Sequence, residues 1–472
     1  PVVDGPAAGY EVSVVPLRDA LVSEARLTLY LLMAAAGLVL LTACANAANL
    51  VLTRNLRRDR EFAVRWSLGA DRASLRRILL AETGVLAAVG AVLGLGLAYL
   101  GLDLLVGFAE RYTTRASEIR MDPVVLVFTA LVGTAAAFAF AFAPALNAHE
   151  ADGASLTRSG TRTTGGGRRL QRGLIVAQVA ASVTVLAAAG LLGRTLLTLN
   201  AVDPGLDVAN TLTLEAPASD DGANPVDVMN LQEQMRRRIA ELPGIQEVGL
   251  GLSVPLRSNM IMLEVKAEGR PNEPGRPVPM AEYRTATPDF FDAAGMRLLS
   301  GRAFQETDQE DTAPVAIVNE ALAQRLFGDD DPIGQRIAWT GQVLSAIGMT
   351  EEWRTIVGVV ANTLDHGPTM AAPPVMFRPF AQSEMPYFPG AFVVRGEQAE
   401  ALAPEVQRII NEMAPETPVL RVATLEQVRQ DTIAAERLNT FLVAVLGALA
   451  LVIASVGLAG VLSFLVSERT SE

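Results

Sequence analysis

Residues 27–53 read LTLYLLMAAAGLVLLTACANAANLVLT, and this stretch has no charged side chain between Arg26 and Arg54. A helix rises about 1.5 Å per residue, so roughly 20 residues cross the hydrocarbon core of a bilayer. Four more uncharged runs of this kind are 83–102, 123–148, 173–193 and 438–467. The sequence therefore predicts five transmembrane helices rather than the buried helices of a soluble core.

The composition agrees with a chain divided between lipid and water. Of the 472 residues, 50% are hydrophobic and 19% are charged, with a formal net charge of -12. This length could hold two or three globular domains. Because the five runs contain no charge, the charged residues are confined to the segments between them.

Several functional classes are excluded by the residues that are rare or missing. A net acidic chain is a poor binder of nucleic acid. The single cysteine, Cys44, cannot form an internal disulfide or a thiolate metal cage, and His149 and His366 are far apart in the sequence. The only lysine, Lys266, is not in a phosphate-binding P-loop. We expect no ATPase site, cofactor, metal or catalytic activity in this chain.

Arginine counts in the connections predict the orientation in the membrane. Segment 54–82 contains eight arginines and 149–172 contains five, whereas 103–122 has three arginines against four acidic residues. Short cytoplasmic loops are enriched in basic residues. The two basic segments are therefore expected in the cytoplasm, and 1–26 and 194–437 on the outer side.

The long outer segment has the pattern of an α+β domain. Residues 200–436 hold 35 acidic and 18 basic residues, a net of -17. A helix is predicted from Asn224-Pro225 to Leu242, and short helices begin at Thr287-Pro288 and at Asn319. Strands are expected at 245–250, 260–267, 316–318, 355–360, 375–377 and 392–394. The predicted fold class is a membrane all-α helical bundle with an α+β extracytoplasmic domain.

The acidic clusters of this domain lack the spacing of a metal site. Asp329 to Asp331 do not follow the EF-hand pattern and are predicted to form a solvated turn. Glu306, Asp308, Glu310 and Asp311 are interpreted as an exposed loop, and His366 as a turn residue.

The two ends of the chain are similar to each other. Arg26-Leu27 leads into the first span as Arg437-Leu438 leads into the fifth, a shift of 411 residues. On the same shift Ala43, Ala48, Arg58 and Glu61 match Ala454, Ala459, Arg469 and Glu472. A long period of this kind favours a duplication. We therefore expect a fragment of a longer protein with two halves of roughly 400 residues each.

The basic segment 56–77 is predicted to contain a short amphipathic helix. Phe62, Trp66 and Leu68 can share one side of it, with arginines around the rest and a break at Gly69. Such a helix suits the membrane interface and equally suits a groove on a partner protein. The residue pattern alone leaves both open.

The same segment resembles the signature of FtsX-type ABC permeases of the MacB class. That signature is Arg-Glu-(apolar)-x-(apolar)-Arg-x-x-Leu-Gly-Ala, and residues 60–70 read REFAVRWSLGA. Trp66-Ser67 departs from the basic or small residues that are commoner there. Further blocks resemble the MacB-like periplasmic core domain, at 287–295, 299–304, 315–327, 331–334, 356–360 and 377–382. The tandem arrangement resembles duplicated orphan permeases.

The resemblance implies an order of domains. The first is a tail of a first periplasmic core domain at 1–26. An FtsX-like transmembrane region follows at 27–148, with helices at 27–53, 83–102 and 123–148 and a cytoplasmic coupling segment at 54–77. After it come a cytoplasmic linker at 149–172, a transmembrane helix at 173–198, a MacB-like periplasmic core domain at 199–437, a transmembrane helix at 438–467 and the start of a second coupling segment at 468–472.

The resemblance also implies partners and a mechanism. A separate ABC ATPase subunit would drive the permease from the cytoplasm, two permease halves would pair in a dimer-like way in membrane lipid, and helices would relay motion to the outer domain. The residues expected to couple to the ATPase are Arg60, Glu61, Phe62, Val64, Arg65, Leu68, Gly69 and Ala70.

Polar and small residues inside the spans are expected to pack helices together. Gly90 and Gly94 form a GxxxG face, and Asn46, Asn49 and Gln178 need hydrogen-bond partners in lipid. An ion path is the alternative for the polar residues. The functional hypothesis is a permease for export or extraction of a substrate at the bacterial inner membrane. Its alternative is an FtsX-like signalling protein that regulates an envelope hydrolase.

Overall fold

The computed structural model describes residues 2–4, 11–13, 16, 26–67, 72–109, 119–133, 165–215, 225–257, 261–271, 277–341, 343–344, 349–383, 390–415 and 419–470. The chain folds into two compact units. A helical unit contains residues 1–197 and 435–472, and an outer unit contains residues 198–434.

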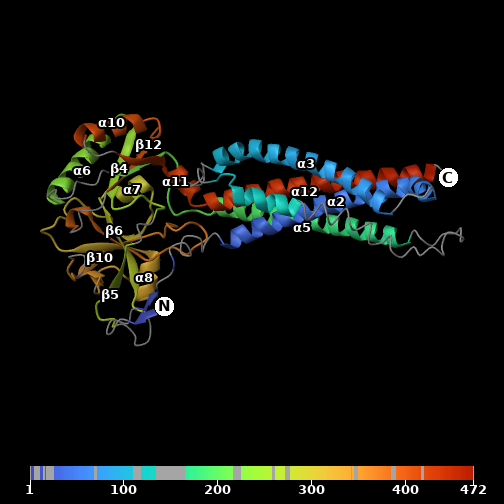
Figure 1. Ribbon diagram of the computed structural model, residues 1–472. Coiled ribbons are helices and arrows are strands. Elements are labelled where there is room, and N and C mark those ends of the chain that lie inside the picture. The colour runs from blue at the N-terminus through green and yellow to red at the C-terminus, as the bar shows by residue number, and fades with distance from the viewer. Residues whose placement is uncertain are drawn as a thin grey trace. The chain divides into compact units, whose positions relative to one another are not determined.

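Long helices make up most of the helical unit. They are α2 (Arg26–Ser67), α3 (Arg72–Ala109), α5 (Gly165–Ala201) and α12 (Ala434–Thr470) (Figure 1). Each contains a segment long and apolar enough to cross a membrane, namely Thr28–Ala48, Ala88–Gly107, Arg172–Ala201 and Ala434–Gly460. The unit also has a short antiparallel pair, β1 (Val2–Asp4) with β2 (Glu11–Ser13).

A shorter apolar helix, Pro123–Gly133, occupies the start of the predicted third span. Pro123 suits the first position of a helix, and the Asp122 carboxylate accepts a hydrogen bond from the backbone N–H of Val125 at 2.7 Å. The rest of that predicted span, 134–148, lies outside the described residues. The described part of the chain thus contains four of the five predicted membrane-crossing helices at full length.

Helix α2 is much longer than the uncharged run that predicts it. Its 42 residues correspond to about 63 Å, roughly twice the hydrocarbon thickness of a bilayer. The helix continues without interruption from the apolar run through Arg54 to Ser67. The first span and the first part of the basic segment are therefore one backbone element.

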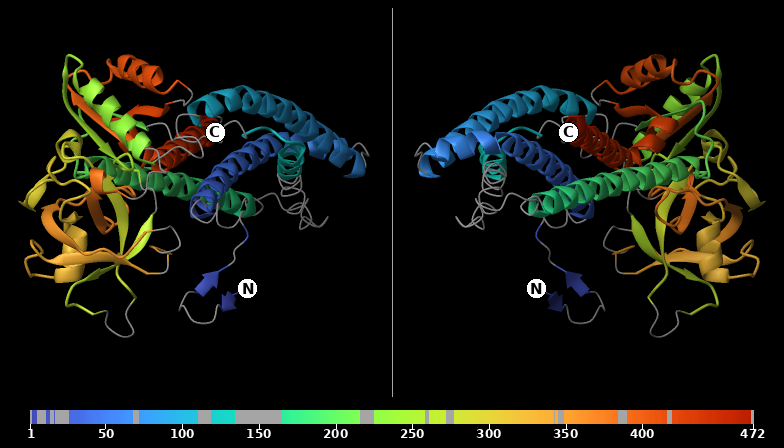
Figure 2. Two further views of the ribbon diagram at one scale, coloured as in Figure 1. Left: turned by 90° about the vertical axis from the view of Figure 1, so that its left-hand side faces the viewer. Right: turned by 90° about the vertical axis from the view of Figure 1, so that its right-hand side faces the viewer.

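An 11-stranded sheet organises the outer unit (Figure 2). Its strands are β3 (Thr211–Glu215), β4 (Ile245–Gly251), β5 (Met262–Ala267), β6 (Met280–Ala286), β7 (Leu298–Gly301), β8 (Val315–Asn319), β9 (Arg336–Thr340), β10 (Arg354–Val360), β11 (Val375–Pro379), β12 (Ala391–Gly396) and β13 (Leu420–Thr424). Six of them form a closed ring in the order β11-β8-β10-β9-β5-β6, because β11 also pairs with β6. The strands β4, β12, β3 and β13 extend the sheet from β6.

Helices cover the two parts of this sheet. They are α6 (Pro225–Ala240), α7 (Phe290–Ala294), α8 (Glu320–Phe327), η3 (Phe380–Gln382), α10 (Ala403–Met413) and α11 (Leu425–Asp431). One apolar cluster packs α6 and α10 on β3, β4 and β12, and a second joins α8 to the strands of the ring. The α+β fold is as predicted, and each predicted strand and helix of this unit has a counterpart.

The Thr287–Gly295 motif forms the centre of a third apolar cluster. Phe290 and Phe291 of α7 are buried and contact each other edge to face, with ring centroids 5.9 Å apart. Gly249 on β4 lies directly under Phe290, where a Cβ atom would collide with the α7 backbone. Gly295 ends α7 with a positive φ of 64°, which glycine adopts easily. The motif is thus explained by packing.

Candidate functional site

Helix α12 makes polar contacts with two other helices, α5 and α2. From α5, Gln178 donates its side-chain amide to the carbonyl of Ala454 at 3.0 Å, and Ser182 lies 3.4 Å from the carbonyl of Ala450. From α2, the Asn46 amide donates to the carbonyl of Ile453. Carbonyl groups of a helix keep a second lone pair, so a side chain can bond to them without breaking the helix. These are interhelical hydrogen bonds from α2 and α5 to the backbone of α12.

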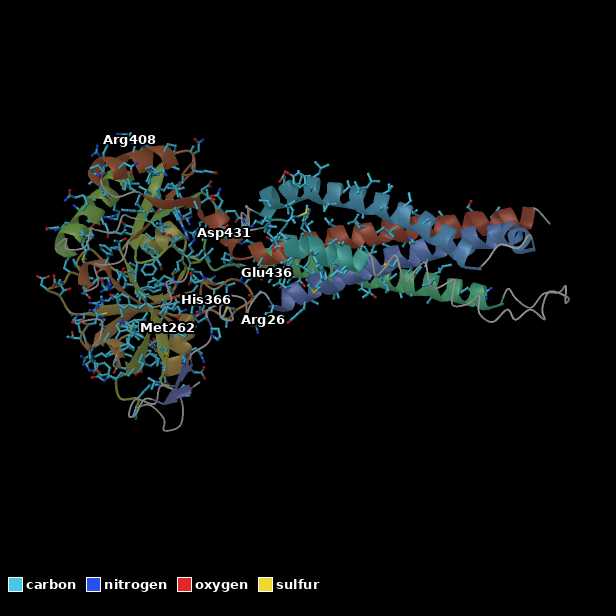
Figure 3. The ribbon with its side chains drawn as sticks, in the orientation of Figure 1. Arg26, Met262, His366, Arg408, Asp431 and Glu436 are labelled. Atoms are coloured by element: carbon cyan, nitrogen blue, oxygen red, sulfur yellow. The ribbon has the colours of Figure 1, made fainter. Side chains whose placement is uncertain are left out.

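The direction of each helix pair follows from these contacts. Gln178 and Ser182 rise along α5 while their partners fall along α12, so α5 and α12 are antiparallel. Arg26 and Glu436, at the starts of α2 and α12, lie at the same end of the helical unit (Figure 3). The helices α2 and α12 are therefore parallel. Both directions agree with the predicted membrane topology.

The predicted coupling residues are described only in part. Arg60, Glu61, Phe62, Val64 and Arg65 all belong to the last part of α2, where the structure gives the backbone. Leu68, Gly69 and Ala70 lie outside the described residues, between α2 and α3. The structure thus adds one fact to the prediction, which is the helical continuity of 60–65 with the first span.

The GxxxG residues are not in contact with another described helix. A Cβ atom built on Gly90 or Gly94 would have no neighbour within 4 Å among the described residues. Asn49 belongs to α2, where its backbone is helical. Close packing at these three positions stays a prediction.

In the outer unit, the loop after β10 holds both ends of the unit. We call residues 361–368 the clamp loop. The Leu364 N–H donates to the carbonyl of Pro204 at 3.1 Å, and a Cβ on Gly367 would lie 3.5 Å from the carbonyl of Thr432. Gly205, with φ of 80°, presses against the backbone of Asn362. The segment that enters the unit and the segment that leaves it therefore meet on the same loop.

A buried ionic network ties the clamp loop to β6. Arg284 Nη2 lies 2.7 Å from Glu282 Oε2 and 3.3 Å from Asp365 Oδ2, and all three side chains are at most 3% exposed. His366 Nε2 lies 2.9 Å from Glu282 Oε1. Burial disfavours the charged guanidinium, but Asp365 and Glu282 outweigh it, so the pKa of Arg284 is raised. His366 does occupy a turn, as predicted, yet its side chain joins this network.

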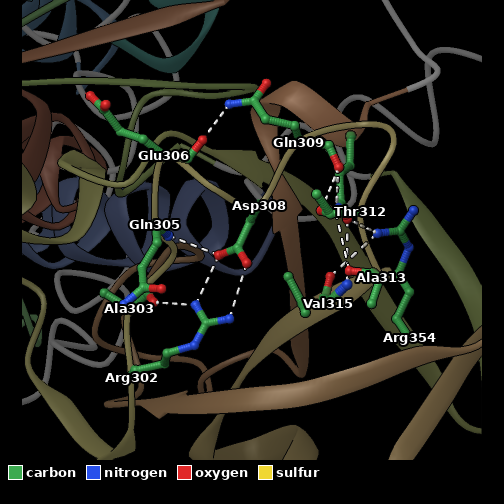
Figure 4. Close-up of polar contacts among 11 residues, drawn as sticks. Arg302, Ala303, Gln305, Glu306, Asp308, Gln309, Thr312, Ala313, Val315 and Arg354 are labelled. Carbon is green, nitrogen blue, oxygen red and sulfur yellow. Dashed lines mark hydrogen bonds and ion pairs between the residues drawn. The ribbon is translucent and has the colours of Figure 1, made fainter.

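A second polar network fixes the loop 302–313 (Figure 4). Arg302 makes two hydrogen bonds to the Asp308 carboxylate, at 2.8 and 3.0 Å, and the Gln305 N–H donates to the same carboxylate at 2.8 Å. Burial opposes ionisation of Asp308, but these bonds prevail and its pKa is lowered. The prediction of an exposed loop is wrong for Asp308, which is 7% exposed. It holds for Glu306, Glu310 and Asp311.

Gln382 holds the other side of that loop. Its side-chain oxygen accepts a hydrogen bond from Arg354 at 2.6 Å, and its amide nitrogen donates to the carbonyl of Gln309 at 3.0 Å. The loop and α6 both line an open cleft of about 530 Å³. Near the cleft, Arg236 bridges Glu233 and Asp289 at 2.8 and 2.7 Å. Networks of polar side chains like these have no local sequence signature, since the residues that they join are far apart in the chain.

The acidic turn before Pro332 is solvated, as predicted. Asp329, Asp330 and Asp331 are exposed, and Asp330 pairs with Arg270 at the surface. Among the described residues, no group of three or more histidine, cysteine or acidic side chains is arranged to hold a metal ion.

Apolar helices long enough to cross a membrane, together with a separate α+β unit of net acidic composition, define a multi-pass membrane protein with a large extracytoplasmic domain. The family model of the MacB-like periplasmic core domain matches residues 173–412, which are 240 of the 472 residues, and the FtsX-like permease C-terminal model matches residues 33–150. The chain belongs to the FtsX/MacB-type family of ABC transporter permeases, which places it in the inner membrane.

Individual relatives match over shorter stretches. The macrolide export ATP-binding/permease protein MacB of Neisseria gonorrhoeae (strain ATCC 700825 / FA 1090) is 33% identical over 63 residues, 13% of this chain and 10% of the relative. MacB 1/2 of Paracoccus denitrificans (strain Pd 1222) is 25% identical over 190 residues, 39% of this chain and 27% of the relative. The chain thus spans between a tenth and about a quarter of the length of these relatives.

Solved structures of extracytoplasmic regions are also similar. The periplasmic region of MacB from Actinobacillus actinomycetemcomitans matches with 14% identity and a TM-score of 0.33, over 48% of this chain and 93% of that chain. The extracellular domain of the noncanonic ABC-type transporter YknZ from Gram-positive bacteria matches with 17% identity and a TM-score of 0.30, over 45% and 100%.

Proposed function

We propose that the chain is the permease part of an ABC-type mechanotransmission system that exports or extracts a substrate at the inner membrane. In this proposal a separate ABC ATPase binds the cytoplasmic segment, and the helices carry its motion to the outer domain. Two permease halves pair in membrane lipid to form the working unit. Family membership supports the class, and the finer roles are our inference.

The continuity of α2 is the observation that carries this proposal. A helix is stiff over several turns because each backbone N–H is bonded to a carbonyl four residues away. The coupling residues 60–65 are in the same helix as the apolar span that begins at Thr28. A displacement of the basic end of α2 would therefore move the span rather than bend a loop.

The clamp loop gives the outer end of the proposed relay. Residues 204 and 432 come from the two ends of the outer unit; Pro204 is hydrogen bonded to Leu364 of the clamp loop, and Thr432 lies beside Gly367 of the same loop. The clamp loop follows β10 of the ring directly and is tied to β6 by the Arg284 network. Motion of either end would therefore be passed to the sheet and not absorbed by a flexible linker.

Reconstitution with the ATPase tests the coupling role. The chain would be purified with its co-purifying ABC ATPase and placed in proteoliposomes, with ATP hydrolysis measured with and without permease. Replacing both Arg60 and Arg65 by glutamate should abolish stimulation, since a partner groove for arginine is acidic. The control variant Arg169→Glu changes the other basic segment and should retain stimulation.

Two outcomes would contradict the proposal. Full stimulation by the double variant would place the ATPase contact elsewhere. Recovery of a cell-wall hydrolase as the main partner, without any ABC ATPase, would favour the signalling function instead.

A macrolide is the first transport probe, because the named relatives export macrolides.

A further inference from the structure

Helices α2 and α12 touch at positions that are equivalent in the internal repeat. The shift of 411 residues that aligns Arg26 with Arg437 also aligns Thr28 with Asn439. Asn439 Nδ2 lies 3.5 Å from Thr28 Oγ1. The same shift aligns Asn46 with Gly457. A Cβ atom built on Gly457 would overlap the side-chain amide of Asn46.

Contacts between equivalent positions of two parallel helices indicate a two-fold axis between them. In a two-fold interface, residue i contacts j and j contacts i, so a residue meets its own equivalent only where the axis passes. Positions 28 and 46 are 18 residues apart, which is five turns of helix and about 27 Å. Both on-axis contacts are therefore on one face of each helix and span nearly the whole hydrocarbon thickness.

The two on-axis residues near the cytoplasmic side are complementary but not identical. Asn46 is 8% exposed and donates to the carbonyl of Ile453, in the turn of α12 that precedes Gly457. Gly457 supplies the space that the asparagine fills. A side chain at position 457 would occupy the place that the Asn46 amide has here, while two glycines would leave a gap and no side-chain donor. The same pairing of an asparagine with a glycine recurs about one turn later, where the shift of 411 residues aligns Asn49 with Gly460.

We propose that the Asn46–Gly457 pair directs α2 to pair with α12 of its own chain and excludes α2 of a second copy. The α2–α12 contact is then a two-fold interface built within one polypeptide. This inference rests on the pairing of two permease halves proposed above, and it is independent of ATP-driven coupling. Discrimination comes from steric overlap in the wrong pair and from the Asn46–Ile453 hydrogen bond in the right one, where the Asn46 side-chain oxygen is buried without a hydrogen-bond partner among the described residues.

Disulfide cross-linking of the full-length chain in native membranes tests the pairing without nucleotide or ATPase. The single cysteine is first removed as Cys44→Ser, which copies Ser455 at the equivalent position. In this background the double variant Thr28→Cys/Asn439→Cys should form a cross-link within one chain under copper phenanthroline. The single variant Thr28→Cys should give no cross-linked dimer. A strong dimer from Thr28→Cys alone would overturn the proposal.

Exchange of the on-axis residues gives the sharper test. In the cross-linking background, Gly457→Asn and Asn46→Gly should each reduce the intrachain cross-link several-fold. The exchanged variant Asn46→Gly/Gly457→Asn should restore it, because a two-fold axis lets either helix carry the asparagine. Gly447→Ala, where a Cβ has ordinary contacts with α5 at 3.7 Å or more, should leave the cross-link unchanged.

Loss of the cross-link in the exchanged variant, with a monodisperse protein in detergent, would show that no such axis exists. If a single variant fails to fold, the exchanged variant still decides the question. An intact cross-link together with lost ATPase stimulation would contradict the proposed function and leave the interface standing.

Discussion

His366 Nε2 lies 2.9 Å from Glu282 Oε1, so a side-chain contact holds the clamp loop to β6, one of the strands of the closed ring. Glu282 in turn shares Arg284 with Asp365. Two buried carboxylates of this network share one guanidinium, and this arrangement indicates which substitution should be most damaging.

Replacing Arg284 by methionine should destabilise the outer domain by about 3–5 kcal/mol, because it leaves buried carboxylates uncompensated. The free energy of unfolding can be followed by the fluorescence of Trp339 and Trp353, which both belong to this unit. Arg297 is exposed, so Arg297→Met serves as the control and should change stability by no more than about 0.5 kcal/mol. Equal losses in both variants would argue against a special role of the network.

Asp308→Asn should cost about 1–3 kcal/mol at neutral pH, because hydrogen bonds to a charged group are lost. The folded state lowers the pKa of Asp308 despite its burial, through Arg302 and the Gln305 N–H. The stabilisation is therefore present above the unfolded value of about 3.9 and is lost as the pH falls through the lower folded value. The difference between wild type and variant should shrink below about pH 4. The exposed Asp311→Asn is the matched control.

Gln382→Ala should loosen the loop 302–313 without unfolding the domain. The change removes the donor to the carbonyl of Gln309 and the acceptor for Arg354, which is 3% exposed. Amide hydrogen exchange should rise in residues 305–313 and stay unchanged in α10. Gln382→Glu keeps the acceptor for Arg354 and loses the donors, so its exchange should be intermediate. Unchanged exchange in the alanine variant would contradict the anchoring role.

Gly205→Ala should disturb the clamp loop more than Gly269→Ala disturbs its own turn. Both glycines have positive φ, at 80° and 73°, so both variants carry a strain of about 1–2 kcal/mol. A Cβ at Gly205 would also collide with the carbonyl of Asn362, while a Cβ at Gly269 would have no neighbour within 4 Å. Thermal unfolding of the two variants should therefore differ, and a smaller loss for Gly205→Ala would be inconsistent with the contact.

Prediction from sequence succeeded where a short stretch of the chain carries the signal by itself. Uncharged runs predicted the helices because lipid excludes charge along the whole span. Asn319 predicted the start of α8 because its side chain caps the helix, accepting from the Leu322 N–H at 3.1 Å. These signals are local, so they can be read without knowing the fold.

Prediction failed where polar groups are buried by partners distant in sequence. The strand β6 was not predicted, since Glu282 and Arg284 replace the apolar residues that a buried strand normally shows. Asp308 looked like its exposed neighbours until Arg302 and the Gln305 N–H were brought around it. The sequence predicts the repeat, but the proximity of Asn46 to Gly457, which the shift of 411 residues aligns, is seen only in the fold.

The closed ring of strands has a mechanical consequence. The clamp loop belongs to the connection between β10 and β11, and both strands are hydrogen bonded to β8 between them. A pull on the loop therefore loads β10 and β11, which both pair with the intervening β8, along their length, so that the bonds of both ladders resist together in shear. Rupture of one ladder would still leave the others connected around the ring.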